Sequence, residues 1–248
     1  MSKKVNWQKV GKGAVIVLIL GYILSFVTMF ANASQMRICS TCHVTIADGD
    51  RLRFVDEKDV LDLLAEDDLN PLGVRSEFVS TAEMEKSLES KSRIKDAECY
   101  KTPKGSVNVV VLQREPVMRV MTTNANYYID SEGGEMALTD RFAAYVPIVT
   151  GNVKKSFAKG ELYEFALFLH NDKFWNAFVE QIDVDSRQEL TIVPRVGNQI
   201  IRLGSLEDYK KKLNKLYSIY QNGFNKMGWN MYKEINLKYD GQVVCTKK

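Results

Sequence analysis

One apolar run near the N-terminus constrains this chain more than any other feature. Residues 13–31 contain no charged side chain, and four lysines lie within residues 1–12. A helix of about 19 residues spans roughly 28 Å, close to the thickness of a bilayer's hydrocarbon core. Basic residues mark the cytoplasmic side of a membrane span. The sequence therefore predicts a cytoplasmic tail over 1–12, a transmembrane helix over 13–31, and the remaining residues outside the cytoplasmic (inner) membrane.

A cleavable signal peptide is the alternative interpretation of this segment. Ala31, Asn32 and Ala33 form an A-x-A pattern, which is typical of a signal-peptidase site. The apolar core of a signal peptide usually has ~7–15 residues, and this run is longer. The length favours a retained anchor over a secreted, soluble product.

The charge balance excludes one class of partner. The net charge is +3 and the N-terminal lysines contribute +4, so residues 13–248 carry −1. Nucleic-acid-binding domains need a basic patch or stripe, so we expect no nucleic-acid partner. The four cysteines suffice for one or two disulfides in an oxidising compartment, and their pairing and redox state stay open. They are Cys39, Cys42, Cys99 and Cys245.

A linker over 32–37 leads into a region with the pattern strand, helix, helix, strand, strand. The first helix has acidic residues in its first turn and places Val60 and Leu64 on one face. Thr81 is the expected N-cap of the second helix. Residues 107–112 are rich in β-branched side chains, which favours a strand. These features predict a small α+β domain over 38–120.

Residues 121–248 mix helices and strands and predict a second domain. An i, i+3, i+4, i+7 stripe of Leu162, Phe165, Ala166 and Leu169 indicates an amphipathic helix. A longer helix is expected over 206–227. The strands expected around it cover 190–193, 199–203, 234–239 and 242–245. The fold class is therefore α+β, and we expect a twisted, antiparallel-rich sheet in the second domain.

One short motif points to a cofactor. Residues 39–43 read C-x-x-C-H, the attachment pattern of c-type haem. His43 begins an alternating strand pattern rather than a helix, and His170 is the one other histidine. A thioredoxin-like redox site would need a strand before the cysteines and a helix after them. The favoured interpretation is a cysteine pair at the start of a strand, and a membrane-anchored c-type cytochrome is the alternative.

The remaining motifs do not indicate catalysis. Residues 151–156 resemble a phosphate loop without its second glycine. Residues 183–187 begin like a calcium loop but place Arg187 where a ligand belongs. We therefore predict no enzyme activity, no cofactor, no metal site and no small-molecule substrate.

Several segments together resemble the FtsQ/DivIB family of bacterial cell-division proteins, especially its Bacteroidetes type. The resemblance begins with the single anchor and residues 54–60. It continues through residues 94–101 and through 109–120, which read V-V-V-L-Q-R-E-P-V-M-R-V. Residues 128–133, 190–198, 202–204 and 235–239 extend it over nearly the whole chain. In that family, a Q-R-x-P-x-x-R-V pattern ends a POTRA domain and a β domain follows.

The resemblance implies a non-enzymatic scaffold of the divisome that spans the membrane once. Such proteins bind FtsB/FtsL-type partners outside the membrane and help to place FtsW/FtsI-type septal synthases. Localisation at the division septum is implied as well. A POTRA-type envelope assembly adaptor unrelated to division is the alternative function.

The resemblance also implies where a partner binds. In the family, a partner segment adds along the last strands of the β domain, where an unpaired edge offers main-chain donors and acceptors. Carried over to this sequence, the partner-binding edge comprises Tyr239, Gln242, Val243, Val244 and Cys245, with Arg202 as a charge contact on a neighbouring strand.

Overall fold

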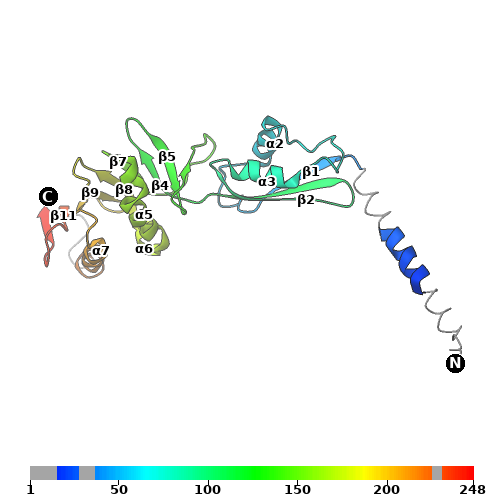
Figure 1. Ribbon diagram of the computed structural model, residues 1–248. Helices are drawn as coiled ribbons and strands as arrows, with labels where there is room; N and C mark the ends of the chain where they lie inside the picture. Colours follow the sequence, from blue (N-terminus) through cyan, green and yellow to red (C-terminus); the bar gives the residue numbers. More distant parts are fainter. Residues whose placement is uncertain (1–15, 28–36, 225–230) are drawn as a thin grey trace, which may run out of the picture. The chain divides into compact units, whose positions relative to one another are not determined.

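The computed structural model describes residues 16–27, 37–224 and 231–248, which divide into two compact units. The first unit comprises the residues up to Ala47 together with Asp56–Leu112. The second comprises Asp48–Val55 and Gln113–Lys248. The ribbon in Figure 1 shows the course of the chain through both.

The N-terminal segment is helical over residues 16–27, and the rest of the expected 13–31 span lies outside the described residues. Among the helices that the structure describes, none has both the length and the apolarity required to cross a membrane.

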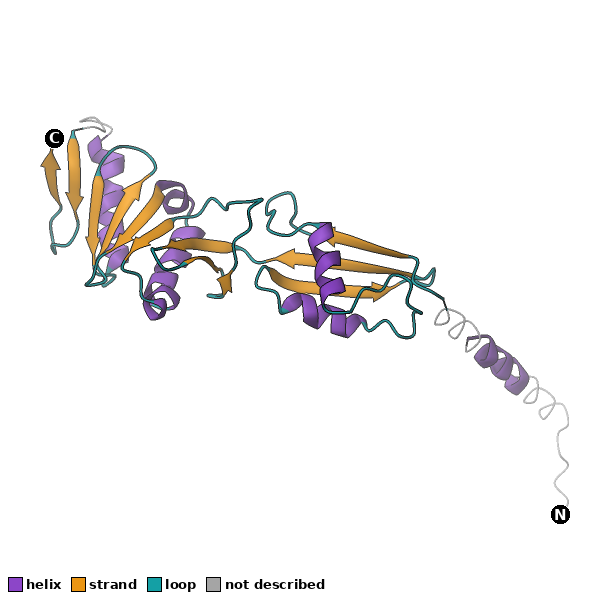
Figure 2. Cartoon of the chain, turned by 90° about the horizontal axis from the view of Figure 1, so that it is seen from above, coloured by secondary structure: helices purple, strands orange, loops and turns teal. Residues whose placement is uncertain are grey.

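The first unit is a three-stranded sheet covered by two helices, in the predicted order. Its elements are β1 (Thr41–Ile46), α2 (Glu57–Glu66), α3 (Thr81–Glu89), β2 (Ile94–Lys101) and β3 (Ser106–Gln113). The strand order is β1-β3-β2, and β1 runs parallel to β3. Figure 2 shows the helices alongside the strands; α2 packs against β1 and α3 against β2.

Local capping explains where these two helices begin. Asp56 accepts a hydrogen bond from the N–H of Asp59, whose side chain accepts one from the N–H of Asp56, so the two form a capping box. The expected N-cap Thr81 is wrong by one residue: Ser80 caps α3, and Thr81 is its first helical residue. Both helices then present buried faces to the sheet through Val60, Leu64, Met84 and Leu88.

The second unit contains a nine-stranded mixed sheet of order β12-β11-β10-β9-β8-β7-β4-β5-β6. Its first strands are β4 (Pro116–Met121), β5 (Asn126–Asp130), β6 (Glu135–Met136) and β7 (Ile148–Gly151). Its later strands are β8 (Val179–Val184), β9 (Leu190–Pro194), β10 (Ile200–Gly204), β11 (Tyr232–Asn236) and β12 (Val244–Lys247). Three neighbouring pairs, β4–β7, β7–β8 and β10–β11, are parallel and the others are antiparallel. The prediction of a mixed, antiparallel-rich sheet is confirmed.

Helices supply much of the second unit's core. They are α4 (Lys155–Lys159), α5 (Glu161–Asn171), α6 (Lys173–Phe178) and α7 (Tyr209–Ser218), and α7 continues as the π-helical turn η1 (Ile219–Phe224). The predicted stripe on α5 is confirmed, because Leu162, Phe165, Ala166 and Leu169 are fully buried. The expected helix over 206–227 begins later, at Tyr209, because Asp208 adopts a left-handed conformation with φ +53°.

The second unit begins earlier than the domain expected at residue 121. Strand β4 is an interior strand of the nine-stranded sheet, so the residues from Gln113 onward belong with that sheet. Residues 48–55 also belong to the second unit. The Gln113 side chain accepts from the N–H groups of Phe54 and Val55 at 2.8 and 2.9 Å and donates to the Leu52 carbonyl at 2.8 Å. The buried Phe54 ring packs edge-on against Tyr128 at 5.4 Å.

Candidate functional site

The candidate site is the edge of the nine-stranded sheet formed by β12. Strand β12 pairs antiparallel with β11, with Ile235 opposite Cys245 and Asn236 opposite Val244, and it is the last strand on that side. Val244 is 42% exposed. Edge strands leave one row of N–H and C=O groups unpaired. This edge can therefore accept another extended segment.

The direction of the free groups on β12 follows from one hydrogen bond. The N–H of Lys248 donates to the Met231 carbonyl at 3.2 Å, so it faces β11. N–H groups in an antiparallel strand alternate between its two sides. By that alternation the N–H groups of Thr246 and Val244 face β11, and those of Lys247 and Cys245 face away from the sheet.

The residues of the predicted edge fall into three groups. Val244 and Cys245 lie in β12, which runs over Val244–Lys247 rather than over the expected 242–245. Tyr239, Gln242 and Val243 lie in the connection that leads from β11 to β12. A turn with Gly241 at φ +73° lies within this connection, and Gln242 and Val243 stay outside the strand that the pattern assigned to them.

Two edge residues also contribute to the core. Val243 and Cys245 pack against the hydrophobic cluster of the second unit. Burial raises the pKa of the Cys245 thiol above its ordinary value. The core-facing side of β12 is thus used for folding, and its outward edge is available.

Arg202 lies on β10, with β11 between it and β12. Its Nε atom lies 2.9 Å from Oε2 of Glu234 on β11, and the two side chains are 49% and 28% exposed. An exposed ion pair of this kind contributes little to stability. Arg202 is therefore already paired within the sheet, and a partner carboxylate at this position would compete with Glu234.

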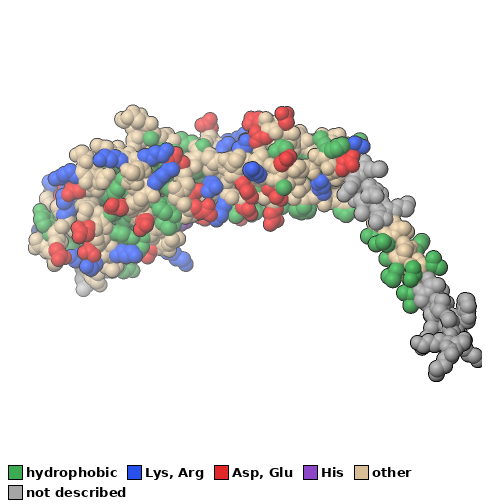
Figure 3. Space-filling model, viewed as in Figure 1, with side chains coloured by type: hydrophobic (Ala, Val, Ile, Leu, Met, Phe, Trp, Pro, Cys, Tyr) green, Lys and Arg blue, Asp and Glu red, His purple; other side chains and the backbone are tan. Residues whose placement is uncertain are grey.

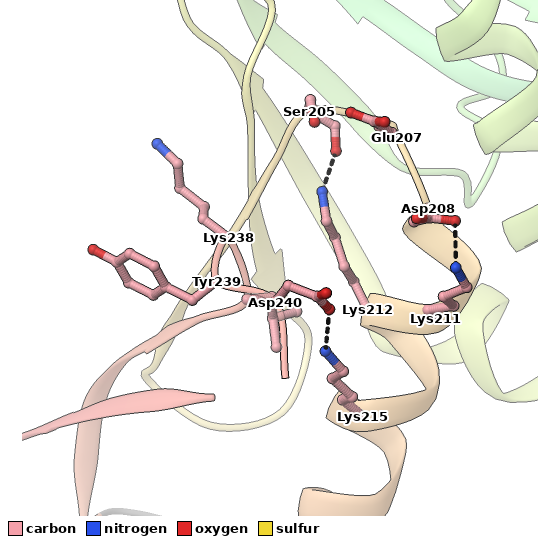
Figure 4. A pocket seen from close by; sticks show the side chains of 10 residues that line it. Ser205, Glu207, Asp208, Lys211, Lys212, Lys215, Lys238, Tyr239 and Asp240 are labelled. Atoms are coloured by element: carbon pink, nitrogen blue, oxygen red, sulfur yellow. Dashed lines mark hydrogen bonds and ion pairs between the residues drawn. The ribbon is translucent and has the colours of Figure 1, made fainter. Parts of the chain in front are cut away.

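A hollow of about 260 Å³ lies beside the connection between β11 and β12. Figure 4 shows three lysines of α7 along one wall and Lys238, Tyr239 and Asp240 along the other, with Lys238 and Tyr239 pointing away from the helix. Each lysine has a partner: Lys211 with Asp208 at 3.1 Å, Lys212 with the Ser205 carbonyl at 2.8 Å, Lys215 with Asp240 at 3.5 Å and Lys238 with Glu189 at 2.6 Å.

These lysine contacts are ion pairs and hydrogen bonds at the surface. The Lys215–Asp240 pair joins α7 to the turn before β12, and Lys238 joins the same connection to Glu189, just before β9. Burial lowers the pKa of Lys212, while neighbouring acids, Glu207 first, oppose the shift. Since every lysine of the hollow already has a partner, we do not assign a ligand to it.

The cysteine motif does not have the geometry of a haem attachment. Cys42 and His43 are consecutive residues of the extended strand β1, and consecutive strand residues point to opposite faces. Cys39 is buried, and its backbone bonds to the 73–74 segment. Burial, with a smaller contribution from Cys39, raises the pKa of Cys42 to about 11. Strand β1 contains Cys42 and continues to Ile46, where a thioredoxin-like site would have a helix, so that order of elements is also not met.

Other candidate residues have structural roles. His170 lies at the end of α5 with Nε2 3.5 Å from Oε1 of Glu115. Thr150 and Gln181 share a hydrogen-bonded network with Asp183 in the region of the calcium-like motif. Within residues 16–27, 37–224 and 231–248, no group of three or more histidine, cysteine or carboxylate side chains is arranged to hold a metal ion.

Comparisons with known proteins match both units. A family model described as FtsQ/DivIB, C-terminal related matches residues 115–246, more than half of the chain. A model described as a POTRA-like domain matches residues 37–112. No curated protein matches the chain.

Proposed function

The chain belongs to the FtsQ/DivIB family, and on this premise we propose that it acts as a non-enzymatic scaffold of the bacterial division machinery. The match over residues 115–246 is the observation that carries the proposal. In this role the protein binds FtsB/FtsL-type partners and helps to place FtsW/FtsI-type septal synthases. The POTRA-like domain and the domain that ends in β12 are both of non-enzymatic scaffold types.

We propose that the FtsB/FtsL-type partner binds by adding a strand to β12. The support is an exposed edge at the end of a large sheet, with Val244 exposed and the N–H groups of Cys245 and Lys247 directed outward. Main-chain hydrogen bonds then supply affinity, and side chains at the edge supply specificity. Tyr239, 52% exposed, lies beside this edge and offers an aromatic contact.

A pair of proline variants tests strand addition. Lys247→Pro removes an outward N–H and keeps the bonds between β12 and β11, so we expect partner binding at least tenfold weaker with the melting temperature unchanged. Thr246→Pro removes an inward N–H and is the matched control, because it should loosen the β11–β12 pair itself. Binding of the full-length chain to an FtsB/FtsL-type partner is measured by calorimetry. Undiminished binding by a folded Lys247→Pro protein would contradict strand addition.

We further propose that residues 13–31 anchor the chain in the inner membrane, with the N-terminus cytoplasmic. The described part of this segment is a helix with apolar side chains exposed around it, including Leu18 at 73% and Leu24 at 68% (Figure 3). A helix that is apolar all round needs an apolar environment. Anchoring in the partners' own bilayer raises their effective concentration at β12.

Localisation distinguishes this function from an envelope assembly adaptor. A fluorescent fusion to the full-length chain should concentrate at midcell and stay with membranes after alkaline extraction. Replacing Leu18 and Leu24 with aspartate should release the protein, because charges at the centre of a span cost about 2.5–3.5 kcal/mol each. A uniform envelope signal would favour the adaptor, and a shorter, released product would indicate a cleaved signal peptide.

A further inference from the structure

Arg195 has two buried donors without partners. It follows β9 directly, and its backbone N–H donates to the Phe178 carbonyl at 2.8 Å. The side-chain Nε and Nη2 atoms are buried and have no hydrogen-bond partner in the described part of the chain. Leaving buried donors unpaired costs free energy, because the groups lose their hydrogen bonds to water and gain none in the protein. The Arg195 guanidinium therefore has two donors that could bind an acceptor from another molecule.

The two unpaired atoms form one edge of the guanidinium. Nε and Nη2 donate in parallel from the same side of the plane, and their spacing matches the two oxygens of a carboxylate. A single carboxylate would satisfy both donors at once. The chemistry of the free edge therefore specifies the kind of ligand.

Tyr145 holds the plane of this arginine. The Arg195 Cζ atom lies 3.6 Å from the centroid of the Tyr145 ring, so the guanidinium is stacked on its face. Stacking occupies a face of the guanidinium and leaves its in-plane N–H groups for hydrogen bonds. Tyr145 itself is 74% exposed and lies just before β7, in a segment without regular secondary structure.

The surroundings have the composition of a protein-binding hot spot. Val196, next to Arg195, is 58% exposed. Tyrosine and arginine are enriched among residues that dominate binding energy, especially where an apolar contact accompanies them. Tyr145, Arg195 and Val196 thus combine an aromatic surface, an apolar side chain and an unpaired charge.

We propose that Arg195 and Tyr145 form a recognition site for a glutamate or aspartate side chain on an acidic segment of a partner protein. The carboxylate binds the Nε–Nη2 edge in bidentate fashion, in the plane of the guanidinium, while the Tyr145 ring stays stacked on its face. Because Nε and Nη2 are buried, the groups that cover this edge shift to admit the carboxylate. Strands β10 and β11 separate β9 from β12. The site is therefore a second contact, distinct from strand addition at the sheet edge.

Binding to an immobilised peptide tests this site directly. The probe is a short peptide with two adjacent glutamates, and its reference is the same peptide with glutamines. We expect the full-length chain to bind the glutamate peptide at least tenfold more tightly. Arg195→Lys keeps the positive charge but removes the two parallel N–H donors of the guanidinium, so we expect about a tenfold loss of affinity for the glutamate peptide. Equal binding of both peptides, or full binding by Arg195→Lys, would overturn the proposal.

A matched arginine separates a specific site from general charge attraction. Arg187 is 73% exposed and already lies near Asp185 and Glu189. Arg187→Lys should leave peptide binding unchanged. An equal loss in both variants would mean that the peptide senses only overall charge, which contradicts a site at Arg195.

Stability and independence complete the test. Because its buried donors are unpaired, Arg195→Met should leave the melting temperature unchanged or raise it. A fall of about 3 °C or more would show that the guanidinium is a structural group and would overturn the proposal. Lys247→Pro should bind the glutamate peptide like the natural sequence, so failure of strand addition and failure of carboxylate recognition are distinguishable.

Discussion

Strands β8 and β12 belong to one sheet but differ in burial, because β8 lies in its interior and β12 at its edge. Strand β8 lies between β7 and β9, and its Val179, Ile182 and Val184 are at most 1% exposed. Strand β12 has one neighbour and contains no fully buried residue. Buried side chains are therefore concentrated in the interior of the sheet, and β12 contributes fewer of them. Changes at each region should show this separation.

The largest effect is expected at the interior. Phe165→Ala on α5 removes a fully buried ring that packs edge-on against Tyr209 at 5.1 Å. We expect the free energy of unfolding to fall by about 3–5 kcal/mol. Denaturant titration of the full-length chain measures it, with the partly buried Leu167→Ala as the control. If Phe165→Ala lowered the free energy of unfolding no more than Leu167→Ala, the stability would not be concentrated in the buried interior.

The next largest effect is expected at a buried polar group. Gln113→Ala leaves the N–H groups of Phe54 and Val55 and the Leu52 carbonyl without their partner. We expect a loss of about 2–4 kcal/mol and faster proteolysis within residues 48–55. Gln242→Ala, at an exposed edge position, should change stability by less than about 0.5 kcal/mol. Similar losses in the two variants would contradict the assignment of Gln113.

Thiol titration sharpens the contrast between Cys42 and Cys99 in the first unit and Cys245 on the edge strand β12. Burial raises the pKa of Cys42 to about 11 and of Cys99 to about 12, with smaller contributions from neighbouring acidic groups or thiols. Both values exceed the ordinary thiol pKa, so between about pH 9 and 11 the thiols ionise in the unfolded chain before they ionise in the folded protein. The free energy of unfolding is therefore highest below about pH 9 and falls as the pH rises towards 11. At pH 8 a thiolate-directed reagent should label Cys245 first. Equal labelling rates, or unfolding free energies constant from pH 8 to 11, would argue against buried thiols.

The smallest effect is expected at the exposed ion pair near the edge. Arg202→Ala removes the contact with Glu234 and should cost less than about 0.5 kcal/mol. A double-mutant cycle with Glu234→Ala measures the coupling energy. A coupling energy above about 1 kcal/mol between Arg202 and Glu234 would contradict this expectation, because it would show that the exposed pair stabilises the fold.

Elements with a local signal were predictable from the sequence. The stripe on α5 follows helical spacing, and β3 follows its run of valines, so both are where the residues indicate. The sequence offers Asn171 or Asp172 as the cap of the helix that follows, and Asp172 caps α6 through two backbone N–H groups. Such signals act over a few residues and survive without tertiary information.

Features that depend on distant contacts were not predictable. Gln113 and Phe54 are bonded across 59 residues of sequence, and no local pattern assigns residues 48–55 to the second unit. The stacking of Arg195 on Tyr145 joins two segments separated by α4–α6 and β7–β9. The sequence indicates a strand near residue 245, but its bounds, Val244–Lys247, and its pairing with β11 are set by contacts that no local pattern shows. The partner-binding role of that edge stays a prediction.

The allocation of residues 48–55 has a consequence for biosynthesis. The chain passes between the units at residues 47–48, 55–56 and 112–113, so neither is encoded by one uninterrupted stretch. On the ribosome, Phe54 emerges well before Gln113 and Tyr128, the groups that it needs. Residues 48–55 therefore stay exposed until the start of the second unit has been synthesised. They can reach their final packing only after residues 113–128 have left the ribosome.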